Sequence, residues 1–502
     1  MATVATLRLI NDFRADLIRE AEDIKDDFLP TSWGDIFIPS GHYKALRLDT
    51  MIVEGMRGAG KSFWTEVLRR PELRKQLITK VPVLDLDQLV DCKSVSWDRR
   101  AAQDLPTKTT VKRLLVLPEF EVSLFWGAII LAQFPDDIAP YVDEEDSVDN
   151  WTGRISWAQS NPEIVHRLLK TIDSRYALKK QCVMVVIDGL DVVSSSFPDT
   201  RRLLRGLFEL LLDFRHAKGL RMKVFVREDM ISRSQADFSD ASKLFNEKVN
   251  LDWTQEDLYA LVYHYMGQRS KRFRGLVTRV TKISWPKTGL DHTELFTTAS
   301  QEKVFIALAG PYMGNQPTKG HVYRWLFNHL ADGKQRVSPR TFLKAIKAAL
   351  EETKSRFASY QYAMHHEGIR QGVRRASEDR VMELANEYHW VENALQPLKT
   401  NKLAVPLDWS KLQACWTKGR TTGSSTVQTI EALSKERGWL IPWDMDDRNL
   451  DKDVALRDAL VDIGVLQIRV KQDLLRIDLP DIYRLGYGIG RFGGISRANH
   501  KS

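Results

Sequence analysis

Four residues near the start of the chain have the spacing of a phosphate-binding loop. Gly55, Gly60, Lys61 and Ser62 form the pattern G-x-x-x-x-G-K-S, with the apolar run MIV before it and a helix-compatible segment, FWTEVLRR, after it. Glycines let backbone N–H groups curve around phosphate oxygens, and the N-terminus of the following helix adds its dipole. The pattern therefore predicts a Walker A loop, in which the lysine reaches the β- and γ-phosphates and the hydroxyl of Ser62 binds magnesium.

The same loop defines the predicted contacts to the nucleotide, which we expect to be ATP with Mg²⁺. The residues predicted to contact it are Gly55, Arg57, Gly58, Ala59, Gly60, Lys61, Ser62 and Phe63.

A second carboxylate is needed on the metal side, and the segment VMVVID supplies it. Five apolar residues that end at Asp188 are typical of a buried parallel strand, and we predict that Asp188 and Ser62 are the metal-binding pair. Most ATPases of the additional-strand class carry a glutamate directly after this acid, but Gly189 stands there in this chain. The next acid is Asp191, which we predict polarises the attacking water, with helix capping as the alternative.

The following apolar segment, RMKVFV, predicts a further strand that ends at Arg227. An arginine at a strand tip beside the loop can face the γ-phosphate and distinguish ATP from ADP, while a solvated loop charge is the alternative. Lys61, Asp191 and Arg227 are therefore predicted to be catalytic.

Together these segments resemble the AAA+-related P-loop ATPases of the STAND and KAP type, in particular bacterial ATPases found in conflict and anti-phage gene neighbourhoods. The resemblance covers roughly residues 30 to 350. It is carried by MIVEGMRGAGKSFW, VVIDGLD, KVFVRED, FSDASKLFNEKVNLDWTQEDLYAL and VSPRTFLKAI. It implies that Asp191 is the second acid of the STAND pattern and that Arg227 is the arginine at the tip of the next strand.

The resemblance also implies a second sensor. Ser338 and Pro339 predict the start of a helix that is similar to the lid helix of AAA+ relatives. Arg340 would then reach the γ-phosphate and is the fourth predicted catalytic residue, with an exposed first-turn arginine as the alternative. No arginine finger can be assigned, so a finger supplied in trans and slow, switch-like turnover both remain open. The candidates for the finger are Arg201, Arg202 and Arg205.

The elements that must position these residues predict an α/β fold. It comprises a P-loop NTPase core with a parallel sheet, then a helical lid and a C-terminal winged-helix-like α+β domain. We expect the second strand at 81–86, inserted helices at 121–134 and 161–178, and a short strand at 249–253, before a capping box that opens at Thr254. Four tryptophans of the insertion are expected in the core more often than at an interface. They are Trp97, Trp126, Trp151 and Trp157.

Four segments are predicted along the chain. They are an N-terminal helical segment at 1–45, the P-loop core at 46–253 with a long insertion at about 88–180, a helical lid and helical domain at 254–400, and a winged-helix-like domain with a basic tail at 401–502.

The last segment ends in a predicted hairpin. The runs 465–470 and 474–478 alternate around a turn, after two predicted helices. The last 38 residues contain seven Lys and Arg against three acids, so DNA contact through this basic region is a further expectation.

Composition sets the class of protein. The chain has 502 residues, with 74 Lys and Arg against 66 Asp and Glu, for a net charge of +8. Its 43% of hydrophobic residues excludes a chain that is mainly disordered. Its three cysteines, Cys92, Cys182 and Cys415, are too scattered for a disulfide framework and indicate a reducing compartment. The longest apolar run, 122–134, is too short to span a bilayer. We therefore expect a cytoplasmic protein without membrane contact.

The function predicted from these features is an ATP-binding and ATP-hydrolysing switch or motor subunit. It would act as a homo-oligomer, with a partner effector protein, or both, and the resemblance suggests a role in bacterial anti-phage defence. The alternative is a DNA-binding regulator that uses the nucleotide only as a structural ligand. A small-molecule kinase is less favoured, because such kinases are usually compact.

Overall fold

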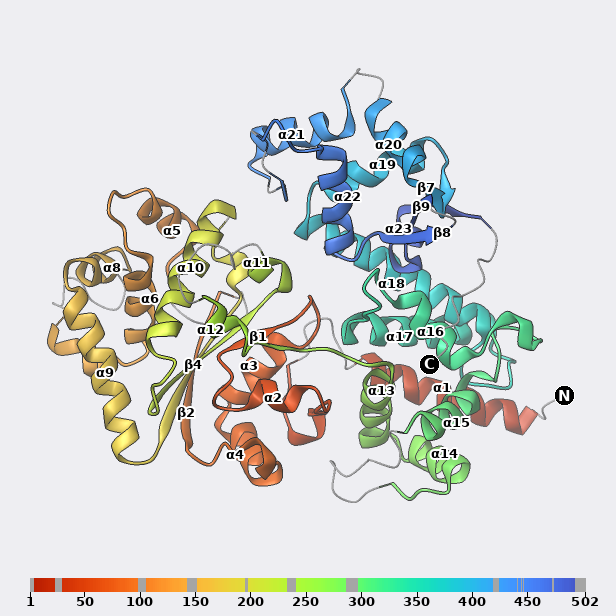
Figure 1. Ribbon diagram of the computed structural model, residues 1–502. Helices are drawn as coiled ribbons and strands as arrows, with labels where there is room; N and C mark the ends of the chain where they lie inside the picture. The colour runs from red at the N-terminus through yellow and green to blue at the C-terminus, as the bar shows by residue number, and fades with distance from the viewer. Residues whose placement is uncertain are drawn as a thin grey trace. The chain divides into compact units, whose positions relative to one another are not determined.

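The computed structural model describes most of the chain. The described residues are 4–22, 29–97, 105–141, 151–194, 197–232, 241–285, 297–418, 424–439, 441–443, 445, 447–471 and 474–492. They divide into two compact units, one comprising Asp27–Trp253 and the other Met1–Asp26 with Thr254–Ser502 (Figure 1). Each unit is described by itself.

The unit of residues 27–253 is built on a five-stranded parallel sheet. Its strands are β1 (Ile52–Glu54), β2 (Leu89–Ser96), β3 (Cys182–Asp188), β4 (Leu220–Val226) and β5 (Val249–Asn250). Their order is β2-β3-β4-β1-β5, so β4 lies between the Walker A strand β1 and the Walker B strand β3. β4 is the further strand that the sequence predicted after Asp188, and the α/β fold class with a P-loop core is confirmed.

Helices cover both faces of the sheet, because its central strands are apolar on both sides. Every residue of β3 is buried, and Val183, Val185 and Ile187 join one large core cluster with the insertion helices and α10. Figure 1 shows α6, α9 and α10 on one side of the sheet and α2, α3 and α4 on the other. The helices of this unit are α2 (His42–Leu46), α3 (Lys61–Arg69), α4 (Pro71–Lys80), α5 (Lys108–Leu115), α6 (Val122–Leu131), α7 (Pro135–Ile138), α8 (Trp151–Ser160), α9 (Pro162–Leu178), α10 (Phe197–Asp213), α11 (Glu228–Ser232) and α12 (Ala241–Phe245), with short 3-10 turns η1 (Trp33–Asp35), η2 (Pro82–Leu84), η3 (Ala139–Tyr141) and η5 (Leu190–Val192).

A buried lysine forms hydrogen bonds to the segment that precedes β1. Lys223, in the middle of β4, is fully buried and donates hydrogen bonds to the carbonyl oxygens of Ala45 (2.7 Å), Arg47 (3.0 Å) and Thr50 (2.5 Å). These carbonyls belong to the end of α2 and the turn before β1, where an ammonium group satisfies acceptors that the short helix leaves open. The contact fixes the start of the Walker A strand.

The second strand was predicted in the wrong place. The segment 81–86 forms the 3-10 turn η2 instead, and β2 begins at Leu89. Pro82 has no backbone N–H to give to a sheet, and Asp85 has a φ of 53°, which is incompatible with a strand. The polar run LVDCKSVS is nevertheless a strand because β3 pairs with it along its length, from Leu89 to Ser96.

The long region between β2 and β3 contains the predicted helices. α6 begins after Glu121, and α9 begins after Asn161, as the sequence predicted. The interpretation of the tryptophans as core residues is also confirmed, because Trp126 and Trp151 are buried and Trp97 and Trp157 pack against the same core cluster. Within the described residues no single helix is long and apolar enough to cross a membrane, although α6 with the segment 135–141 passes that test as a pair bent by 114°.

The other unit is mainly helical. Thr254 forms the predicted capping box with Asp257, and Ser338 caps the predicted helix with Pro339 at its first position. α17 and α18 pack against each other, and α1 lies against α17 and α13. The helices are α1 (Val4–Glu22), α13 (Gln255–Arg269), α14 (Lys271–Thr281), α15 (Thr298–Ala309), α16 (Val322–Leu330), α17 (Pro339–Arg356), α18 (His366–Glu387), α19 (Val391–Thr400), α20 (Trp409–Lys418), α21 (Thr426–Arg437), α22 (Lys452–Asp462) and α23 (Asp481–Tyr487), with the turn η6 (Pro317–Lys319).

The C-terminal part of this unit combines helices with small sheets. The predicted hairpin is confirmed as β8 (Gln467–Lys471) and β9 (Leu474–Asp478), and β7 (Leu407–Asp408) pairs antiparallel with β9 on its other side. β10 (Gly490–Arg491) pairs parallel with β6 (Ala404–Val405). The helix α19 contains Pro397 and ends at Thr400. The division into four segments stays a prediction.

Candidate nucleotide-binding site

The phosphate-binding loop connects β1 to α3 at the carboxyl edge of the parallel sheet. Gly58 and Gly60 have φ values of 77° and 105°, which side chains with a Cβ rarely adopt, so the backbone favours glycine at these two positions of the loop. Gly60 precedes the first residue of α3, and the first N–H groups of that helix have no carbonyl partners within it. The loop therefore presents N–H groups and the positive end of a helix dipole at one place.

Lys61 lies across this loop. Its Nζ donates hydrogen bonds to the carbonyl oxygens of Gly55 (2.8 Å) and Met56 (2.9 Å), so the ammonium group is held at the edge of the loop. A flexible four-carbon side chain can exchange such carbonyl acceptors for phosphate oxygens without a change of the backbone.

Ser62 and Asp188, the predicted metal-binding pair, lie near each other, and their role in binding a metal stays a prediction. The Ser62 hydroxyl lies close enough to the Asp188 carboxylate, which ends β3 beside Ser96 of β2, to lower the pKa of that carboxyl group. Asp188 is only 3% exposed, and burial raises its pKa, against the opposing effects of Ser62 and of the positive charge of Lys61. Burial disfavours the ionised form of this carboxyl group, and a divalent cation beside it would compensate the negative charge. A buried carboxylate with a hydroxyl and an ammonium group nearby is therefore suited to bind such a cation.

Asp191 and Arg227 also lie close to each other. Asp191 follows Gly189, whose φ of 73° turns the chain sharply after β3, and its side chain is 40% exposed. Arg227 follows the last residue of β4, and its Nη1 lies 3.7 Å from Asp191 Oδ2. The guanidinium also forms two hydrogen bonds to Asp229, at 3.0 Å and 3.2 Å. The strand tips of β3 and β4 thus place a water-accessible carboxylate beside a largely buried arginine.

Arg340 belongs to the other unit. It lies in the first turn of α17, and its Nη1 is 3.6 Å from Glu383 Oε1 on α18. Its predicted role as a second sensor stays a prediction. Among the finger candidates, Arg202 donates to the carbonyl oxygens of Leu115 (2.6 Å) and Phe120 (2.7 Å), so it holds the α5–α6 connection.

Three aromatic residues form a hydrogen-bonded group next to the phosphate-binding loop. They are a histidine and two tryptophans, which were not identified from the sequence. Trp64 Nε1 on α3 donates to His42 Nδ1 at 3.1 Å, and His42 Nε2 lies 3.1 Å from the carbonyl oxygen of Asp252. Because an indole nitrogen can only donate, His42 Nδ1 must be the acceptor and Nε2 must carry the proton. Trp253 contacts the His42 ring edge-on and donates from Nε1 to the carbonyl oxygen of Ala59, inside the loop, at 2.9 Å.

A buried carboxylate directly before the loop was also missed. Glu54 ends β1, is 2% exposed, and its Oε2 lies 2.8 Å from Lys248 Nζ. Burial raises the pKa of Glu54, with smaller contributions from Glu228 and Asp252, while Lys248 lowers it. An acid at the last position of an otherwise apolar strand was the only available signal in the sequence.

The C-terminal cations, proposed from the sequence as a DNA contact, are engaged within their own unit. Arg491 and Arg469 lie 2.7 Å and 3.2 Å from the buried carboxylate of Asp478. Arg484 is paired with Asp481 at 2.7 Å, and Arg476 with Asp408 at 3.5 Å. Arg497, Lys501 and the side chain of Lys471 lie outside the described residues. Each described arginine of this region therefore has an acidic neighbour.

Comparison with known proteins gives little further information. No protein-family model and no curated protein matches the chain. Among solved structures, the Aeropyrum pernix ORC2 protein in its ADPNP-ADP complexes has a TM-score of 0.39 at 11% identity, covering 94% of this chain and 96% of that one. The same protein in its ADP form has a TM-score of 0.33 at 12% identity, covering 92% and 93%. Similarity at this level supports no statement about activity.

Proposed function

We propose that the chain binds Mg·ATP at the loop between β1 and α3 and hydrolyses it as a nucleotide-dependent switch or motor subunit. The observation that carries the proposal is the placement of the Ser62 hydroxyl beside the buried carboxylate of Asp188, next to the loop. The two residues come from different elements, and a purely structural loop would not need a buried carboxylate at this position.

Each residue of the site has a part in this proposal. The loop N–H groups and Lys61 bind the phosphates, and Ser62 and Asp188 hold the magnesium ion, which supplies charge neutralisation when bound. Asp191 orients the attacking water and accepts its proton, and the products are ADP and inorganic phosphate. Arg227 responds to the γ-phosphate by exchanging its contacts with Asp191 and Asp229 for phosphate oxygens.

Finer aspects of the function rest on the resemblance seen in the sequence. We propose an AAA+-related ATPase of the STAND or KAP type that works with a partner effector in anti-phage defence, with Arg340 as a second sensor. The helices α20–α22 followed by the β8–β9 hairpin support a winged-helix-like C-terminal domain.

Phosphate release and nucleotide binding, measured in parallel, test this function. We expect the natural chain to release phosphate from Mg·ATP, Lys61→Ala to lose nucleotide affinity, and Asp191→Asn to bind nucleotide while turnover falls by about 10² or more. Asp87→Asn, an exposed acid of the same unit, is the matched control and should behave as the natural chain. Binding without turnover in the natural chain would refute the enzymatic proposal, and normal turnover in Asp191→Asn would remove Asp191 from its role.

A further inference from the structure

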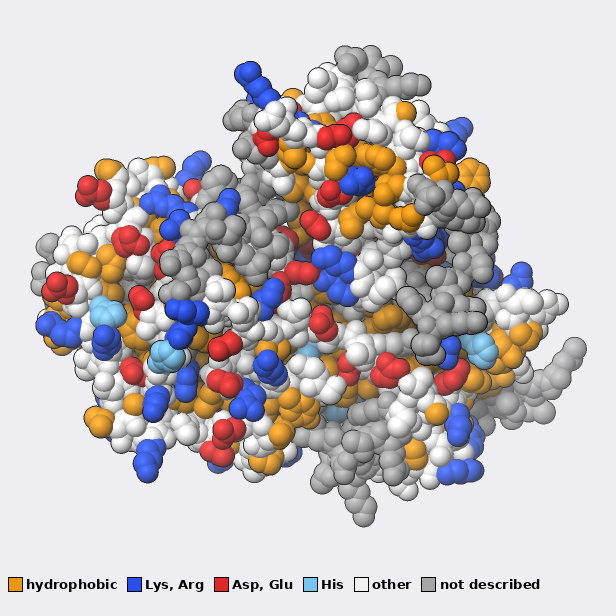
Figure 2. Space-filling model, in the orientation of Figure 1, with side chains coloured by type: hydrophobic (Ala, Val, Ile, Leu, Met, Phe, Trp, Pro, Cys, Tyr) orange, Lys and Arg blue, Asp and Glu red, His pale blue; other side chains and the backbone are white. Residues whose placement is uncertain are grey.

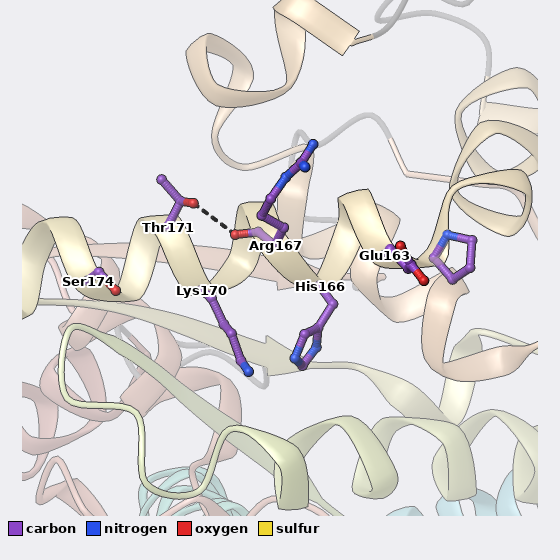
Figure 3. Close-up of a pocket in the computed structure, with 7 residues that line it drawn as sticks. Glu163, His166, Arg167, Lys170, Thr171 and Ser174 are labelled. Atoms are coloured by element: carbon purple, nitrogen blue, oxygen red, sulfur yellow. Dashed lines mark hydrogen bonds between the residues drawn. The ribbon is translucent and has the colours of Figure 1, made fainter.

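The polar face of α9 lines a hollow of ≈ 690 Å³. Its lining includes Glu163, His166, Arg167 and Lys170, and all of these side chains are exposed. Figure 3 shows His166 and Lys170 pointing to one side of the helix and Arg167 to the other. The opposite face of α9, with Leu168, is packed into the core, so the helix holds these cations on a rigid support.

The segment before β4 adds further cations beside this helix. The ring of Phe214 contacts His166, and Asp173 Oδ1 on α9 accepts hydrogen bonds from the backbone of Gly219 (2.6 Å) and Leu220 (2.9 Å). A Cβ at Gly219 would lie 2.0 Å from the carbonyl oxygen of Asp173, so only glycine permits this approach.

We call this surface the α9 basic strip. It comprises His166, Arg167, Lys170, Arg215, His216 and Lys218. Figure 2 shows Lys, Arg and His side chains gathered over α9 and the turn before β4.

The lysines and arginines of the α9 basic strip outnumber Glu163, the one acid that lines the hollow. Among the described residues, no carboxylate forms an ion pair with any of its four lysines and arginines, and Asp173 is occupied by backbone N–H groups. Elsewhere the chain balances exposed helical cations at i,i+4, for example Arg205 with Glu209 and Arg356 with Glu352. Arg167 and Lys170 are like charges three residues apart on α9, with Glu163 four residues before Arg167, and an anion bound over the strip would relieve the remaining repulsion.

We propose that the α9 basic strip binds the phosphate backbone of duplex nucleic acid without reading its bases. On α9 the strip runs from His166 to Lys170, about 6 Å from the rise of ~1.5 Å per residue, and a duplex carries a charge about every 1.7 Å of its axis. The residues that line the hollow include hydroxyl groups, Thr171 and Ser174, which suit phosphate oxygens. They include no Phe, Tyr or Trp on which the bases of a single strand could stack.

Binding of a fluorescent 20-base-pair DNA of arbitrary sequence, measured by anisotropy without nucleotide, tests the proposal. We expect affinity that falls with salt with a slope near −3.6, from about four phosphate contacts. The variant Arg167→Glu with Lys170→Glu should bind at least about tenfold more weakly and with a slope smaller by about two. Lys112→Glu with Arg113→Glu makes the same change of charge on exposed α5 and is the matched control, expected to bind as the natural chain.

The outcomes separate the proposal from general attraction and from other partners. Equal weakening by both charge reversals would overturn it, as would an absence of DNA binding or a preference for poly-glutamate over the duplex. Thermal unfolding of both variants within a few degrees of the natural chain excludes misfolding as the cause. Phosphate release by the α9 variant should be unchanged, so failure here leaves the proposed ATPase function untouched.

Discussion

His42 makes the stability of the nucleotide-binding unit depend on pH. Burial lowers the pKa of His42 to about 3, and protonating Nδ1 would place two donors, that nitrogen and Trp64 Nε1, against each other. The unfolded chain binds this proton near pH 6.5 and the folded chain does not, so the stabilisation is complete above pH 6.5 and is lost as the pH falls towards 3. The expected loss is about 1.4 kcal/mol per pH unit.

Urea unfolding of the natural chain and His42→Gln, followed by tryptophan fluorescence between pH 4 and pH 7.5, measures this effect. A glutamine can still accept and donate but does not titrate, so the difference between the two chains should change with pH only below about 6.5. Parallel curves for His42→Gln would show that this ring does not titrate on unfolding.

Some residues of the candidate site could be predicted from the sequence, and others could not. Lys61 and Ser62 were predicted because glycine conformation and helix start are local properties, and Asp188 because an acid after a long apolar run is a local signal. His42 and Glu54 act through contacts with Trp64 and Lys248, far along the chain, so no local pattern marks them. Only burial in the folded unit gives these two side chains unusual pKa values.

At the scale of elements, one arginine joins α1 to the connection between α17 and α18. Arg14 is fully buried and donates to the carbonyl oxygens of Ala363 and Tyr362, both at 2.8 Å, and to Asn11 Oδ1 at 2.5 Å. Arg14→Ala would leave these acceptors buried without a donor, which costs about 1.5–3 kcal/mol for each charged hydrogen bond lost.

Hydrogen exchange of α1 tests this contact more directly than global unfolding, because the chain has two units. We expect amides of α1 in Arg14→Ala to exchange at least about tenfold faster, with the sheet of the other unit unaffected. Arg19→Ala, an exposed arginine paired with Asp16 on the same helix, is the control and should change little. Unchanged protection of α1 in Arg14→Ala would show that apolar packing alone holds the helix.

Elements with local signals were predicted well, and those fixed by pairing were not. The capped helices at Thr254 and Ser338 and the β8–β9 hairpin follow from caps, proline and alternation. β2 is half polar and exists because β3 lies beside it, so the apolar segment 81–86 was a better match to the pattern than the true strand. In β2, pairing with a neighbouring strand therefore outweighs the local propensity of the sequence.

At the scale of the whole molecule, net charge alone gave an incomplete account of where an anionic partner could bind. Counting residues placed half of the surplus in the last 38 positions, but the described arginines there pair with Asp478, Asp481 and Asp408. The α9 basic strip contains fewer residues and was not marked by any run of charge. Ion pairing in the folded chain, and not the number of cations, determines which charges are available to a partner.

The predicted sensor role of Arg340 can be tested by asking whether nucleotide bound in one unit affects the other unit. The loop at 55–60 lies in one unit and Arg340 in the other, so a sensor role requires ATP bound at the loop to change the first turn of α17. We expect a slowly hydrolysed ATP analogue, compared with ADP, to slow hydrogen exchange both at the loop and at this turn in the natural chain. In Arg340→Ala the change at the loop should remain and the change at α17 should be lost, because the sensor proposal requires this side chain. Lys347→Ala, on the same helix, is the matched control and should keep both changes. If the natural chain shows no nucleotide-dependent change at α17, Arg340 is a structural partner of Glu383 and not a sensor.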